Sequence, residues 1–267
     1  MVSDEQVLPS VKTIIDDARD LYRESASITQ RNSVPDTNSI PIENPRNWLK
    51  IPDVICIFVD MRGSTQLSAY SHDNSTARAY QLFTGTAVKL FSDFEAPYID
   101  VRGDGALALF DQNQAHRALA AAVTFRTFAT EEFVPLVHGK TGLDVGCHVG
   151  IDMRTVLVRK IGFKRYRGRT DRQNEVWAGR PVNMAAKLSS ESGDKELLVS
   201  DRYYKKLTSR YALKSCGCPG NKVVDLWSEK DVSEDDRFDF ETAYSLGSVW
   251  CKTHGKEFCT KLMAEDE

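Results

Sequence analysis

The chain has 267 residues, a formal net charge of −3 and six cysteines. Its length suffices for one large hydrophobic core, or one core with a small appendage, and its charge argues against a general attraction to nucleic acid or membranes. Because no apolar run could cross a bilayer and residues 1–5 lack the basic and apolar regions of a signal peptide, we expect a cytoplasmic protein.

Residues 1–49 are predicted to form a helix and a linker. Apolar side chains recur at helical spacing between residues 6 and 24, which predicts an amphipathic helix. Residues 26–48 contain three prolines and few apolar side chains, which is typical of a linker or an irregular surface segment. We expect the helix to pack on its own domain, and a contact within a dimer is the alternative.

A short apolar run at residues 54–59 ends in an acidic residue and is followed by a small polar turn. The run is rich in β-branched residues and does not alternate, so it predicts a strand buried on both faces, with Asp60 where it leaves the core. Gly63 allows close backbone approach to a ligand, and Ser64 or Thr65 can begin a helix. A carboxylate beside such a turn can hold a metal and a phosphate together, although an Asp that merely caps a helix fits the same pattern.

A second acidic residue follows a predicted core helix at residues 74–95. Two strand-like arms flank Gly103-Asp104-Gly105, which is a strong signal for a β-hairpin. Asp104 alone is explained by turn chemistry. However, adjacent strands would bring Asp60 and Asp104 into one site, and two convergent carboxylates are what Mg²⁺ or Mn²⁺ needs to bridge a polyphosphate.

The remaining elements complete a mixed sheet. Residues 179–188 open a helix in which Asn183 and Lys187, four positions apart, share one face. The order of elements predicts an α+β fold with helices over one face of the sheet. The other predictions are helices at 112–130 and 201–208, and strands at 143–151, 155–158, 197–199 and 223–227.

Seven cations lie between residues 159 and 172. Such an arm could bind a triphosphate or nucleic acid, and a solvated hairpin arm or a dimer contact are equally open interpretations. Few aromatic side chains are interleaved with the cations, which gives little support to binding of single strands.

Three motifs, in this order, resemble those of the class III nucleotidyl cyclases. Residues 58–65 are similar to the strand end and phosphate-holding turn of the family's first metal aspartate, and Gly103-Asp104 to its second, on a hairpin. Residues 182–187 are similar to the family's helix with a ribose-orienting Asn and a transition-state Arg, whose position Lys187 takes. The resemblance covers residues 50–228. It implies a ferredoxin-like α+β catalytic domain that forms a homodimer with two shared active sites.

The resemblance also implies roles for individual residues. Asp60, Met61 and Asp104 would bind two divalent cations, Mn²⁺ or Mg²⁺. Asn183 would orient the ribose, and Lys187 of the partner subunit would meet charge developing on the α-phosphate; Lys keeps the charge of Arg but loses its two-pronged geometry. The backbone N–H groups of residues 61–65 would hold the β- and γ-phosphates. The residues of this stretch assigned to nucleotide binding are Phe58, Met61, Arg62, Gly63, Ser64 and Thr65.

The base-reading positions of the family are occupied by Asp100 and Val176. The Lys and Asp pair that reads adenine is absent, and the layout looks most like the bacterial pyrimidine cyclases of the Pycsar antiphage systems. The resemblance therefore implies a uridylate cyclase that makes 3′,5′-cyclic UMP from UTP for a separate effector protein. The alternatives are a cytidylate, guanylate or adenylate cyclase, a catalytically inactive nucleotide-binding module, or a nucleic-acid-binding protein that uses the arm at 159–172.

Residues 229–267 are predicted to form a small C-terminal module, similar to the AGS-C domain of those cyclases. Cys251 and His254 have the spacing of metal ligands, and with Cys259 plus Cys216 or Cys218 they could bind a structural Zn²⁺. Unliganded thiols are the alternative.

Overall fold

The computed structural model describes residues 2–3 and 5–267. The strands are β1 (Ser27–Gln30), β2 (Asn47–Arg62), β3 (Tyr98–Arg102), β4 (Gly105–Phe110), β5 (Gly146–Gly162), β6 (Gln173–Ala178), β7 (Leu197–Ser200), β8 (Trp227–Asp231) and β9 (Thr242–Leu246). The helices are α1 (Pro9–Arg23), α2 (Ser64–Tyr70), α3 (Asp73–Asp93), α4 (Ala115–Phe128), α5 (Val134–Thr141), α6 (Arg180–Glu191), α7 (Asp201–Tyr204), α8 (Arg210–Leu213) and α9 (Gly255–Met263).

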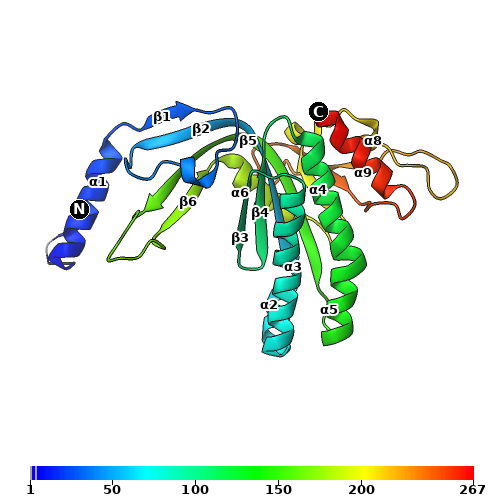
Figure 1. Ribbon diagram of the computed structural model, residues 1–267, viewed down its shortest axis with the longest axis horizontal. Coiled ribbons are helices and arrows are strands. Elements are labelled where there is room, and N and C mark those ends of the chain that lie inside the picture. Colours follow the sequence, from blue (N-terminus) through cyan, green and yellow to red (C-terminus); the bar gives the residue numbers. More distant parts are fainter. Residues whose placement is uncertain (1, 4) are drawn as a thin grey trace.

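One mixed sheet organises the molecule, with strands in the order β3-β4-β2-β5-β7-β9-β8 (Figure 1). The central strand β2 runs antiparallel to both β4 and β5, and helices connect β2 to β3 and β4 to β5. This βαββαβ arrangement is the ferredoxin-like fold, so the predicted α+β class is confirmed. The end of β2 and the tip of the β3–β4 hairpin lie at the same edge, because Asp60 is in register with Gly105.

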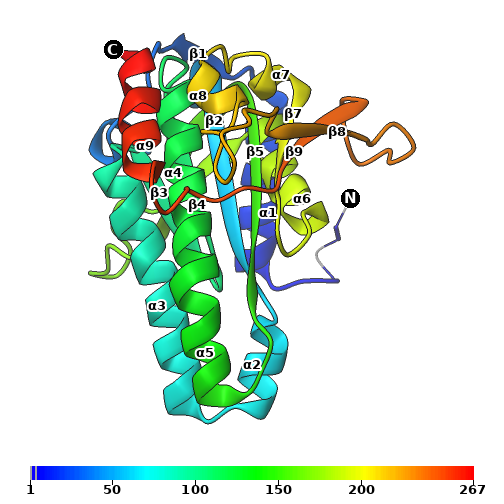
Figure 2. The ribbon, with the colours of Figure 1, turned by 90° about the vertical axis from the view of Figure 1, so that its right-hand side faces the viewer.

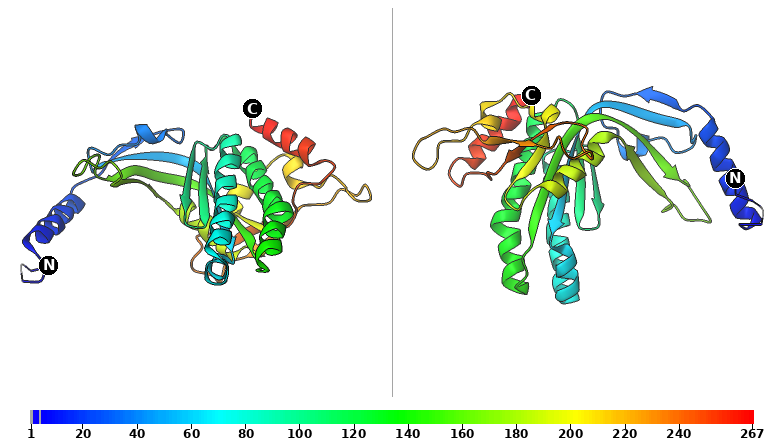
Figure 3. Two further views of the ribbon diagram at one scale, coloured as in Figure 1. Left: turned by 60° about the horizontal axis from the view of Figure 1, so that its bottom comes forward. Right: turned by 180° about the vertical axis from the view of Figure 1, so that it is seen from behind.

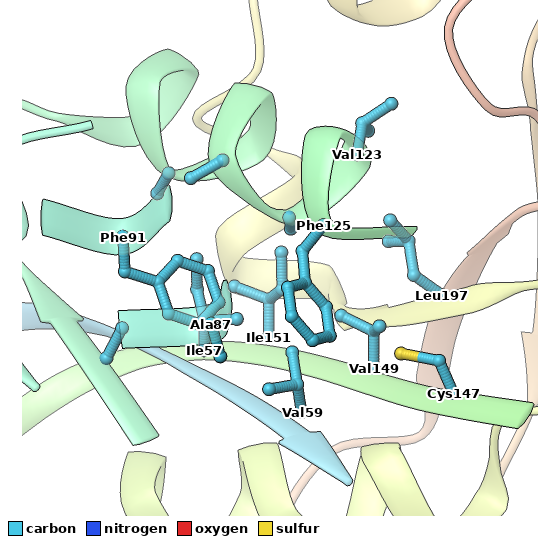
Figure 4. Close-up of a cluster of buried hydrophobic side chains, with 14 of the residues drawn as sticks. Ile57, Val59, Ala87, Phe91, Val123, Phe125, Cys147, Val149, Ile151 and Leu197 are labelled. Carbon is cyan, nitrogen blue, oxygen red and sulfur yellow. The ribbon is translucent and has the colours of Figure 1, made fainter. Parts of the chain in front are cut away.

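The main hydrophobic core lies between the sheet and the helices α3 and α4 (Figure 4). Apolar side chains on one face of β2 and β5 point toward these helices. On the helices, the Phe91 and Phe125 rings stack with their centroids 5.7 Å apart. A fully buried aromatic side chain contributes several kcal/mol, roughly 3–5 when truncated to Ala. This core holds the end of β2, and with it Asp60, in a fixed position.

The opposite face of the sheet is covered by α6, so the expectation of helices over only one face is wrong. Gly150 of β5 makes this contact possible, because a Cβ there would overlap the carbonyl oxygen of Ala185 in α6. Only a residue without a side chain lets the helix lie this close to the strand. This close contact sets the distance between α6, which carries Asn183 and Lys187, and β5. Strand β5 pairs with β2, the strand that carries Asp60.

Two long strands extend beyond this core and form a curved wing (Figures 1 and 3). The regions predicted as separate strands at 143–151 and 155–158 are one continuous strand, β5, whose outer part pairs with β6, while the outer part of β2 pairs with β1. Helix α1 projects from the end of the wing. It buries none of its residues, and Tyr22 is 90% exposed, so it does not pack on its own domain as expected.

The C-terminal segment continues the same sheet and then returns to the helical layer (Figure 2). Strand β8 crosses the predicted boundary at residues 228/229, and β9 pairs with β7. Helix α9 then packs against α4 and α8. The division into a catalytic domain and a C-terminal module stays a prediction.

Candidate active site

Asp60 lies near the end of β2 and faces two neighbouring strands. It is in register with Gly105 on one side and His148 on the other. A Cβ built on Gly105 would lie 3.0 Å from Asp60 Oδ1, so the carboxylate rests directly against the hairpin that carries Asp104. His148 is fixed by a 2.7 Å hydrogen bond between its Nδ1 and the carbonyl oxygen of Ser192.

The electrostatics of this pair suit a divalent cation. Burial raises the pKa of Asp60 and the Asp104 carboxylate raises it further, while His148 and the backbone N–H of Met61 act in the opposite direction. Within the described residues, no Lys or Arg forms an ion pair with either carboxylate. Two oxygen-bearing carboxylates that repel each other and have no cationic partner are the donor set that Mg²⁺ or Mn²⁺ prefers, so the residues fit the metal.

The turn after Asp60 presents backbone rather than side chains. Gly63 has φ +80°, and a Cβ there would lie 2.5 Å from the carbonyl oxygen of Asp144, so both its conformation and its space require glycine. Helix α2 begins at the next residue, Ser64, without a side-chain cap, which leaves the N–H groups of its first turn available for an anion. The Met61 side chain is buried in the core, and the Arg62 side chain pairs with Asp194 at 2.7 Å. Both residues can therefore contact a ligand mainly through their backbone groups.

A separate pocket of about 700 Å³ lies between the β3–β4 hairpin, β6 and α6. It brings together four residues that the sequence assigned to nucleotide binding: Phe58, Asp100, Val176 and Asn183. Neither Asp60 nor Asp104 lines it. The metal carboxylates and the base and ribose positions therefore form two half-sites in one chain.

Lys187 contacts a backbone carbonyl of its own chain. Its Nζ donates to the backbone carbonyl of Arg237, in the segment between β8 and β9. It shares α6 with Asn183, as the spacing predicts. One chain thus contains all four residues predicted to be catalytic without assembling them around a single point.

Two known proteins are similar in sequence to this chain over most of its length, and their similarity shows its family. The chain is 39% identical over 236 residues to a uridylate cyclase of Propioniciclava tarda, covering 85% of this chain and 74% of that protein. It is 34% identical over 234 residues to a uridylate cyclase of Micromonospora echinofusca, with the same coverage of both chains. The chain belongs to the uridylate cyclase family. No family model matches the chain.

Solved structures give the same fold. The guanylyl cyclase Cya2 superposes with a TM-score of 0.60 at 19% identity, covering 75% of this chain and 93% of that one. The adenylyl cyclase CyaB of Pseudomonas aeruginosa superposes with a TM-score of 0.59 at 17% identity, covering 76% of this chain and 96% of that one. The protein is therefore a nucleotidyl cyclase with the class III fold. This confirms the prediction from the three motifs.

Two pocket residues were not predicted from the sequence. Arg102 Nε binds Asp100 Oδ2 at 2.6 Å, so the base-reading carboxylate carries a cationic partner. Trp177 is 8% exposed and lines the pocket. The alternation of β3 could have revealed Arg102, because residues two apart share a face. Trp177 directly follows the predicted residue Val176. Its burial could not be predicted, because it depends on Tyr98 of the distant strand β3, whose ring centroid lies 4.8 Å from that of Trp177.

The basic arm at 159–172 is partly committed to contacts within the chain. Arg159 is 4% exposed and donates to the carbonyl oxygens of Ile42 at 3.2 Å and Asn44 at 3.3 Å. Lys164 pairs with Glu43 at 2.6 Å, and Arg169 pairs with Asp171 at 2.5 Å. The contacts of Arg159 and Lys164 tie the arm to the segment between β1 and β2, whereas the Arg169–Asp171 pair lies within the arm.

The predicted metal ligands near the C-terminus are partly corrected. Cys216, Cys218, Cys251 and His254 form a cluster that could hold a metal ion. Cys259 lies outside it and contacts Thr124, so its assignment as a ligand is wrong, and both Cys216 and Cys218 take part instead of one. In the described residues, no helix has both the length and the apolar character needed to cross a membrane.

Proposed function

We propose that this chain converts UTP to 3′,5′-cyclic UMP and pyrophosphate. The observation that carries the proposal is 39% identity, over 85% of the chain, to a protein named uridylate cyclase. The pocket chemistry supports the same substrate. Asp100 accepts a hydrogen bond and Arg102 donates one beside it, which matches the N3–H and a carbonyl oxygen of uracil.

The chain's own residues have complementary tasks in this reaction. Asp60 and Asp104 would hold two divalent cations, which supply acidification of the ribose 3′-hydroxyl and neutralisation of the triphosphate. Backbone N–H groups of residues 61–65 would hold the β- and γ-phosphates, and Asn183 would orient the ribose. The 3′-oxygen loses its proton to solvent and attacks the α-phosphorus, and the bond to the β-phosphate oxygen breaks. Lys187 of the partner subunit would stabilise the charge that develops on the α-phosphate.

Cytosine and adenine fit the pair of Asp100 and Arg102 less well than uracil does, and guanine fits it equally well. Cytosine offers its 4-amino group to Asp100 but presents an acceptor at N3, next to the carboxylate. Adenine lacks a carbonyl for Arg102. Guanine combines N1–H with O6 and is the strongest competitor, so the proposal needs a direct comparison of all four nucleotides.

Incubation with equal concentrations of the four nucleoside triphosphates and Mn²⁺ should give cyclic UMP as the main product. Products are separated and identified by mass, with the Asp60→Asn variant as the control for contaminating cyclases. Cyclic AMP, cyclic GMP or cyclic CMP as the main product would overturn the proposal.

We further propose that the enzyme acts as a homodimer and that cyclic UMP serves as a second messenger for a separate effector in antiphage defence. The dimer is supported by the two half-sites, and its test is given in the Discussion. The defence role rests on the resemblance to Pycsar cyclases. Loss of protection in cells that carry the Asp104→Asn variant in place of the native chain, during phage challenge, tests it.

A further inference from the structure

Four metal-binding side chains from two distant segments converge beside the C-terminal helix. Cys216 and Cys218 lie in the irregular hairpin 213–226, and Cys251 and His254 immediately precede α9. Their ligand atoms, three sulfurs and one imidazole nitrogen, all lie within 4.8 Å of one another. All six cysteines are free thiols. The cluster contains none of the residues that the resemblance assigns to catalysis or nucleotide binding.

The spacing of these atoms suits a tetrahedral ion. With Zn–S bonds of about 2.3 Å and Zn–N bonds of about 2.0–2.1 Å, tetrahedral geometry places sulfur and nitrogen about 3.6 Å apart. The sulfur of Cys218 lies 3.3 Å from His254 Nδ1, and the sulfur of Cys251 lies 4.0 Å from the same atom. These two distances bracket the tetrahedral value, so small side-chain rotations would complete the geometry.

Each half of the cluster is held in place by contacts of its own. In the hairpin, the Ser215 hydroxyl accepts from the backbone N–H groups of Gly217 at 3.3 Å and Val224 at 3.0 Å. In the other segment, Trp250 Nε1 donates to the Thr124 hydroxyl of α4 at 2.8 Å. These contacts hold the backbone on both sides of the cluster without using the four ligand atoms themselves.

We propose that Cys216, Cys218, Cys251 and His254 bind one structural Zn²⁺. Thiolate and imidazole ligands in a tetrahedral set are those that select zinc over Mg²⁺ or Mn²⁺. Four protein ligands leave no open position for water or substrate, so the ion stabilises the structure and does no chemistry.

The ion would join the C-terminal segment to the body of the enzyme. Helix α9 contacts α4 and α8, and the Phe258 ring packs edge-on against Tyr211 at 5.1 Å. However, Cys216, Cys218 and Cys251 also line an apolar pocket of about 580 Å³ between the hairpin and α9, so packing there is incomplete. A metal bond between residues 216–218 and 251–254 closes this weakly packed region. Removing the ion should release residues 247–267 while the central sheet stays folded.

Elemental analysis of the purified full-length enzyme should give about one zinc per chain. The Cys251→Ser variant, and a variant with both Cys216→Ser and Cys218→Ser, should lose most of it. Cys259→Ser is the matched control, because this nearby thiol lies outside the cluster and its loss should leave the zinc in place. Asp60→Asn should also retain the zinc, which separates this site from the catalytic carboxylates.

A second measurement does not depend on how well the variants fold. Exchange of the native chain into Co²⁺ should give the strong visible absorption of tetrahedral cobalt with thiolate ligands, and proteolysis after chelation should cut first within residues 247–267. Native enzyme without zinc and without this cobalt spectrum would overturn the proposal. So would zinc that is lost as completely in Cys259→Ser as in Cys251→Ser.

Discussion

Asp60→Asn and Asp104→Asn should each lower turnover by at least about 10³-fold, while the protein stays folded. Asn keeps the size of Asp but lacks the negative charge that holds a divalent cation, and loss of metal-based stabilisation of several kcal/mol corresponds to such a factor. Steady-state rates with UTP and Mn²⁺, measured for both variants beside the native chain, test this.

Thermal unfolding separates loss of chemistry from loss of structure. Burial and the neighbouring Asp104 raise the pKa of Asp60 in the folded state, so the ionised form is less favourable there than in the unfolded chain. A neutral Asn removes this cost, and Asp60→Asn should unfold at the same temperature as the metal-free native chain or higher. Asp93→Asn is the control for an exposed acid at the end of α3 and should keep full turnover. Turnover like that of the native chain in Asp60→Asn or Asp104→Asn would contradict the two-metal assignment.

The parts of the site that are local in sequence could be predicted. A buried strand ending in Asp60, a glycine turn and a following helix all follow from residues within a few positions of one another, and the structure contains each of them. The hairpin with Asp104 and the shared face of Asn183 and Lys187 are equally local, since spacing alone fixes them.

The parts that depend on contacts between distant segments could not be predicted. Nothing near Trp177 in the sequence shows that its indole is buried against Tyr98, because that contact joins β3 to β6. The set of thiols likewise depends on how the hairpin meets the segment before α9. Cys259 is close to His254 in the sequence, but it lies on α9 and contacts Thr124 instead.

The exposure of helix α1 could not be predicted from its own sequence either. Its amphipathic pattern predicts the helix but does not say what covers the apolar face. In the single chain that face is open, with Ile14 66% exposed. The two half-sites present the same situation at the active site, since each lacks what the other provides.

Mixing inactive Asp60→Asn with inactive Lys187→Ala under conditions of subunit exchange should restore about one quarter of native turnover, if sites are shared within a dimer. Random exchange makes half of the dimers mixed, and in each mixed dimer one site combines the native carboxylates of one chain with the native Lys187 of the other. The structural reason is that Asn183 lines a pocket without Asp60 or Asp104, and Lys187 contacts Arg237 instead of the carboxylates of its own chain. A mixture of Asp60→Asn with Asp104→Asn is the control and should recover nothing, because each mixed site then lacks one carboxylate. If the first mixture stays inactive although mass spectrometry shows mixed dimers, the site lies within one chain and the shared arrangement is wrong.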